Sequence, residues 1–132
     1  MDIATLDRPG VYIAYPMSPL LKSISHTGDY KAKVNDQHTK VGKTEDSFIS
    51  REKAYMKDFD NEVEFVPVAL SDRVLLKCAE KLILDAVGTD FSKVKGTSEW
   101  FLTSNRRKIA KIIARTLIES GIEHELVGQQ GA

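Results

Sequence analysis

Apolar residues recur at helical spacing in two segments of the second half of the chain. One helix is expected from Ser71, its N-cap, to Gly88. Its expected core stripe is Leu75, Ala79, Leu82 and Ala86, with Cys78 and Ile83 beside it. Another is expected over about residues 105–120, ended by Gly121. Its apolar face is Ile109, Ile112, Ile113, Thr116 and Leu117. Asp46 or Ser47 is a good N-cap for a shorter helix over residues 48–57.

Strands are expected mainly in the first half of the chain. Residues 11–15 read as a strand stopped by Pro16, and residues 37–42 as the returning strand of a hairpin. Residues 62–70 are the clearest strand, in which Pro67 indicates a free edge or an end. Strands and helices together predict an α+β fold, with helices packed on a small antiparallel or mixed sheet.

The length of 132 residues predicts a single domain over residues 10–120. Residues 1–9 and 121–132 are expected as tails, and residues 16–36 as an insertion that forms a loop or hairpin. No apolar run approaches membrane-spanning length and no leader pattern is present, so we expect a soluble cytoplasmic protein that does not bind membranes. The single cysteine, Cys78, is expected to be a buried thiol.

The charges balance to zero, which counts mildly against a nucleic-acid partner, but they are unevenly distributed. Residues 93–115 carry seven basic residues and only one acidic residue, Glu99. Within this stretch a basic ridge is expected on the last helix, made by Arg107, Lys108, Lys111 and Arg115. Such a ridge can follow a nucleic-acid backbone, and an ordinary solvated helix face is the alternative.

Two short motifs lie on the first two expected strands: Gly10-Val11-Tyr12 and Lys40-Val41-Gly42-Lys43-Thr44. Arg51, Glu80 and a Glu99-Trp100-Phe101 run follow in that order. Together they resemble the GIY-YIG nuclease superfamily. The resemblance is closest to its phage-associated and bacterial branch, whose second motif reads Lys-Ile-Gly-Lys-Thr. It spans roughly residues 10–115, and its specificity comes from order and spacing because each motif is short.

The resemblance implies a small, mainly antiparallel three-stranded sheet flanked by helices, with both motifs on neighbouring strands. By position, Tyr12 would contact the attacking water or help to deprotonate it, Arg51 would stabilise the transition-state charge, and Glu80 would hold one Mg²⁺ or Mn²⁺ ion. This set suits phosphodiester hydrolysis, which needs an oriented water, a proton acceptor and positive charge beside the phosphate oxygens.

Lys40 departs from the common family pattern, which has a second tyrosine at this position. The departure removes one candidate proton acceptor and puts more weight on Tyr12. Lys43 can then contact phosphate or help to position the water. Tyr55 lies four residues after Arg51 on the same helix face, so both side chains can point into one cleft.

Each of these residues also has an ordinary structural explanation. Tyr12 can pack its ring with the hydroxyl at the surface, and Arg51 can be a solvated helix residue. Glu80 falls at the edge of an apolar arc that includes Leu76, Ile83 and Val87. A carboxylate placed there is partly desolvated and needs a partner, unless it reaches water.

The expected function is therefore a divalent-metal-dependent endonuclease that hydrolyses DNA phosphodiester bonds in a bacterial or phage-infected cell. RNA is the other candidate substrate, and a homodimer or protein partner would supply specificity. A catalytically silent or partner-dependent nucleic-acid-binding module is the main alternative, because of the neutral net charge and the missing second tyrosine. A purely structural or protein-interaction domain is the third.

Overall fold

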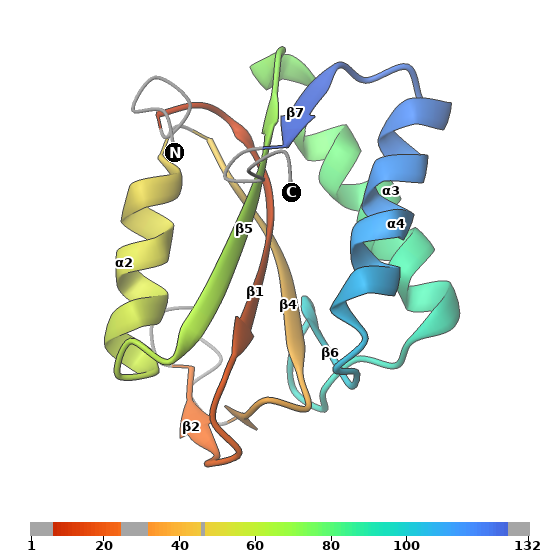
Figure 1. Ribbon diagram of the computed structural model, residues 1–132. Helices are drawn as coiled ribbons and strands as arrows, with labels where there is room; N and C mark the ends of the chain where they lie inside the picture. The colour runs from red at the N-terminus through yellow and green to blue at the C-terminus, as the bar shows by residue number, and fades with distance from the viewer. Residues whose placement is uncertain (1–6, 25–31, 46, 127–132) are drawn as a thin grey trace.

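Figure 1 shows the computed structural model, which describes residues 7–24, 32–45 and 47–126. Its centre is a five-stranded sheet in the order β6-β4-β1-β5-β7, in which all neighbours are antiparallel. The strands are β1 (Gly10–Pro16), β4 (Thr39–Thr44), β5 (Val63–Leu70), β6 (Trp100–Phe101) and β7 (His124–Leu126). The expected α+β class is thus confirmed. The sheet therefore has five strands and not the three that the resemblance implies: three long strands form its middle, and the short strands β6 and β7 extend it at the edges.

Helices cover both faces of this sheet (Figure 1). Helix α2 (Phe48–Asp58) packs on one face, and α3 (Leu76–Asp90) and α4 (Arg106–Glu119) pack on the other. Side chains of β1 alternate between the two layers, so Val11 and Ile13 join the core under α3 and α4. Tyr12 and Ala14 join the core under α2. No helix of the described residues is long and apolar enough to cross a membrane.

Local capping explains where the helices begin. The Ser47 hydroxyl accepts a hydrogen bond from the Ser50 N–H at the start of α2, whereas the other expected cap, Asp46, lies outside the described residues. Asp72, rather than Ser71, caps a 3₁₀ turn, η2 (Arg73–Leu75), which leads into α3. Helix α3 therefore starts later than expected, and it continues past Gly88 to Asp90.

The buried face of α3 differs from the expected stripe. It consists of Leu76, Ala79, Ile83 and Val87. Leu82 is exposed, and the Cys78 thiol, expected in the core, is exposed as well. Both sets of positions have helical spacing, so packing against α4, β1 and β4 selects between them. This choice places Glu80 beside the true apolar face.

The expected insertion contains a small second sheet formed by β2 (Lys22–Ser23) and β3 (Lys33–Val34). Residues 25–31 within it lie outside the described part. The Arg106 guanidinium holds this region to α4: its Nη2 donates to the carbonyls of Pro16 and Asp36, and its Cζ lies 3.9 Å from the Tyr15 ring centroid.

The segment after α4 is not the tail that the sequence predicts, at least as far as residue 126. Ile122 is buried, and β7 pairs with the outer edge of β5 at Val68–Leu70. Beside Pro67 that edge has no strand partner among the described residues, which fits a residue without an N–H. Residues 1–6 and 127–132, expected as tails, lie outside the described part.

Candidate active site

The candidate site lies where β4 becomes the edge of the sheet. Strand β6 pairs only with Thr39 and Lys40, and the Val41 N–H still donates to the Glu99 carbonyl. Beyond that point β4 has no outer strand partner among the described residues. Helix α2 flanks one face of this edge and α3 the other, so side chains from both layers can meet around it (Figure 1).

Two tyrosines form a buried hydrogen-bonded pair on the α2 face. The hydroxyl oxygens of Tyr12 and Tyr55 are 2.9 Å apart, and only 2% of Tyr12 is exposed. The Phe65 ring lies against Tyr12 at a centroid separation of 4.7 Å, and Trp100 meets Tyr55 edge to face. The simple structural expectation for Tyr12, a packed ring with its hydroxyl at the surface, is therefore wrong about the hydroxyl.

Both motif glycines are explained by close approach of neighbouring groups. A Cβ at Gly42 would lie 2.5 Å from Cζ and Oη of Tyr12, the residue opposite it on β1. A Cβ at Gly10 would lie 2.3 Å from the Val68 carbonyl oxygen and 2.4 Å from Cζ of Phe48. Glycine at these positions lets the Tyr12 ring lie on the backbone of β4 and lets α2 pack close to β1.

Burial controls the protonation of Tyr12. Desolvation raises the pKa of its hydroxyl to about 12, against smaller lowering effects of the Tyr55 hydrogen bond and the Arg51 charge. Burial also raises the pKa of Tyr55. Tyr12 is therefore a neutral phenol near pH 7. A neutral phenol can orient a water by hydrogen bonding, but it is poorly suited to accept the water's proton as a phenolate.

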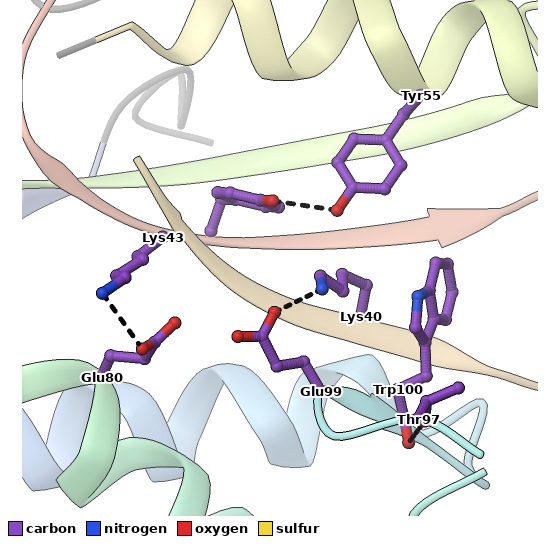
Figure 2. Close-up of polar contacts among 8 residues, drawn as sticks. Lys40, Lys43, Tyr55, Glu80, Thr97, Glu99 and Trp100 are labelled. Carbon is purple, nitrogen blue, oxygen red and sulfur yellow. Dashed lines mark hydrogen bonds and ion pairs between the residues drawn. The ribbon is translucent and has the colours of Figure 1, made fainter. Parts of the chain in front are cut away.

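Two lysine–glutamate pairs lie around the β4 edge (Figure 2). Lys40 donates from its buried ammonium to Oε2 of Glu99. Lys43, on the opposite face of β4, lies 3.5 Å from Oε1 of Glu80. Oε2 of Glu80 is buried and receives no hydrogen bond from a protein donor. Burial, followed by the Glu99 charge, raises the pKa of Glu80, and Lys43 opposes this shift.

Arg51 lines an open cavity beside this cluster. The cavity has a volume of about 400 Å³, and Lys43, Ser47 and Ser50 also line it. Arg51 is exposed, yet its charge acts on both buried tyrosines. A phosphate in this cavity would meet two basic side chains together with the N-terminal turn of α2.

The structure pairs Tyr12 with Tyr55, Lys40 with Glu99 and Lys43 with Glu80. Lys43 and Arg51 line one cavity, whereas Tyr55 is buried and does not line it, so the expectation that Arg51 and Tyr55 point into one cleft is wrong. Glu99 joins them as a functional candidate, although the sequence analysis treated it only as part of a motif. The available signal was an acidic residue directly before a short apolar strand. Its contact with Lys40 forms only when β6 pairs with β4, because that pairing places Trp100 opposite Lys40.

The basic ridge of α4 is not part of this cluster. Arg107 and Lys111 line a groove with Val66 and Val68, which places them toward β5, on the other side of β1 from β4. Lys108 lies 3.7 Å from Asp90, and Arg115 is exposed.

Glu80 is the described side chain that could hold a divalent cation. Among the described residues no group of three or more His, Cys, Asp and Glu side chains is placed to hold a metal ion. Mg²⁺, however, is commonly held by one or two carboxylates, with waters and substrate phosphate as the other ligands. The orphaned Oε2 of Glu80 supplies a carboxylate oxygen of this kind.

Comparisons with protein-family models, with curated proteins and with solved structures found no match to this chain. A function for this chain is therefore inferred from the geometry of the β4 edge and from the short motifs that form it.

Proposed function

We propose that this protein is a divalent-metal-dependent endonuclease of the GIY-YIG type that hydrolyses phosphodiester bonds in DNA, in the cytoplasm of a bacterial or phage-infected cell. One observation carries the proposal. The second motif links the three candidate residues: Lys43 lies 3.5 Å from Glu80 and lines a cavity with Arg51, and Gly42 lies against the Tyr12 ring. Side chains from β1, α2 and α3 are thus arranged around one strand, β4, and this arrangement supports a site of the kind that the motif resemblance implies.

Each candidate site residue has a separate role in the proposed hydrolysis. Arg51 and Lys43 place positive charge in the cavity where phosphate oxygens would gain negative charge. Tyr12 keeps its proton and orients the attacking water. Glu80 would hold Mg²⁺ or Mn²⁺, which supplies Lewis-acid stabilisation of the phosphate and a more acidic bound water. Lys40, in place of a second tyrosine, binds Glu99 and so adds no proton acceptor on the α2 face.

A catalytically silent nucleic-acid-binding module is the second candidate. The observation in its favour is the burial of the Tyr12 hydroxyl, which already has Tyr55 as its partner. In that case Lys43 and Arg51 would bind phosphate without turnover. Binding would weaken steeply with salt, because phosphate contacts release counterions.

A plasmid-nicking assay separates the two candidates. Purified protein is incubated with supercoiled DNA and Mg²⁺ or Mn²⁺, beside Arg51→Ala and Glu80→Gln. We expect each variant to lose about 100-fold or more in rate, as for other preorganised groups that stabilise a transition state. Lys53→Ala and Glu119→Gln are matched controls, because both residues are exposed and lie outside the cavity.

The outcomes are distinct. Cleavage by wild type that the two site variants retain in full would rule out this site. No cleavage with any metal, together with salt-sensitive DNA binding in an anisotropy titration, would support the binding module instead. Parallel assays with RNA decide which nucleic acid is cut.

A further inference from the structure

Four charged side chains form a row across the β4 edge, in the order Lys43, Glu80, Glu99 and Lys40 (Figure 2). Each lysine contacts one oxygen of its own glutamate. The remaining oxygens of the two glutamates lie on the sides that face each other. Each glutamate is therefore paired with a lysine on its outer side, while carboxylate oxygens border the space between the two glutamates.

Two carboxylates that face each other repel unless a positive charge or a proton lies between them. Ionised carboxylates only accept hydrogen bonds, so Glu80 and Glu99 can contact each other directly only by sharing a proton. Oε2 of Glu80 has no protein donor, and the Glu80 side chain is only 13% exposed, so water screens it weakly. Either a proton or a cation would relieve the repulsion.

The proposed function, in which Glu80 binds a cation, favours a cation over a shared proton, and the backbone places Glu99 where it can contact that cation. Glu99 is the residue at which β6 begins to cover β4, and its carbonyl accepts from the Val41 N–H. Its side chain can therefore reach the α3 side of the edge while Lys40 anchors it from the α2 side. The Lys40 ammonium is almost fully buried, so this anchor is held by packing as well as by charge.

We propose that Glu99 is a second carboxylate ligand of the divalent cation at Glu80, and that Lys40 is the residue that positions it. The inference rests on the proposed function, because it takes Glu80 as the first ligand. It also assigns a role to Lys40, which replaces the second tyrosine of the family pattern. The lysine holds a metal ligand instead of handling a proton.

Direct metal binding tests this assignment without reference to cleavage. Mn²⁺ affinity is measured by titration calorimetry for wild type, Glu80→Gln, Glu99→Gln and the exposed control Glu119→Gln. Terbium luminescence, excited through Trp100, reports binding beside residue 99, because Trp100 is the only tryptophan of the chain. We expect the Mn²⁺ dissociation constant to rise at least about tenfold in both site variants and to stay unchanged in the control.

Glu99→Gln leaves the buried Lys40 ammonium without a charged partner, and an unpaired buried charge can unfold the chain. A second pair of variants therefore compares Lys40→Met with the double variant Lys40→Met, Glu99→Gln, in which no unpaired buried charge remains. The double variant is expected to bind Mn²⁺ at least about tenfold more weakly than Lys40→Met alone.

Each failure has its own signature. Mn²⁺ binding that is lost in Glu80→Gln but unchanged by removal of the Glu99 carboxylate would overturn the inference. Glu80 would then hold the metal without Glu99, and the proposed function would stand. Wild type that binds no Mn²⁺ and does not cleave DNA would overturn both.

Discussion

Replacing Gly42 by alanine should displace the central tyrosine of the site. The new Cβ would lie 2.5 Å from Cζ and Oη of Tyr12, whereas carbon atoms in contact lie about 3.5–4 Å apart. The ring must therefore move by about 1 Å. Phe65 and Tyr55 enclose it, so it cannot move without repacking. Overpacking of this kind costs about 1–3 kcal/mol, and loss of the hydrogen bond to Tyr55 adds about 1 kcal/mol.

We therefore expect the free energy of unfolding to fall by about 2–4 kcal/mol, measured by urea denaturation with Trp100 fluorescence as the probe. Gly88→Ala is the matched control, because a Cβ there meets no atom within 4 Å and the residue lies inside α3. It should gain about 1 kcal/mol. A loss below about 0.5 kcal/mol in Gly42→Ala would refute the close-approach explanation.

Three further predictions follow from the same region and from α3. A double-mutant cycle of Tyr12→Phe and Tyr55→Phe should give a coupling of about 1 kcal/mol, and zero coupling would contradict the buried hydrogen bond. In a spectrophotometric titration, the absorbance that Tyr12→Phe removes should have its midpoint near pH 12, not near the ordinary value of 10. Because the fold favours the neutral phenol, the contribution of Tyr12 to the free energy of unfolding falls as pH rises from 10 towards 12. Cys78 should react with a thiol reagent in the native protein, and protection until denaturation would contradict its exposure.

The amino-acid sequence was sufficient to predict the elements whose signals are local. Helix α4 matches its expected apolar face closely, because Ile109, Ile112, Ile113 and Leu117 are all buried. The N-cap at Ser47 satisfies a neighbouring N–H group whatever the rest of the chain does. The order of the motif residues is likewise a property of the chain itself, and it was sufficient to select the candidate site residues.

Tertiary structure decided the features that depend on which surfaces meet. Packing against α4 and the sheet selected Leu76, Ala79, Ile83 and Val87 over a neighbouring stripe of equal helical spacing, and so exposed Cys78. Pairing at the two sheet edges turned short segments into β6 and β7, which are too brief to have a clear periodicity of their own.

The same division applies to the site. The family resemblance selected Tyr12, Arg51 and Glu80 as candidates from short motifs and from the order of residues along the chain, which are properties of the sequence alone. Only the fold decided that the Tyr12 hydroxyl is buried against Tyr55 and that Glu99 faces Glu80 across the end of β4. Burial of a side chain and the distances between charges are set when segments distant in sequence pack together and exclude water. A local sequence pattern therefore does not predict them.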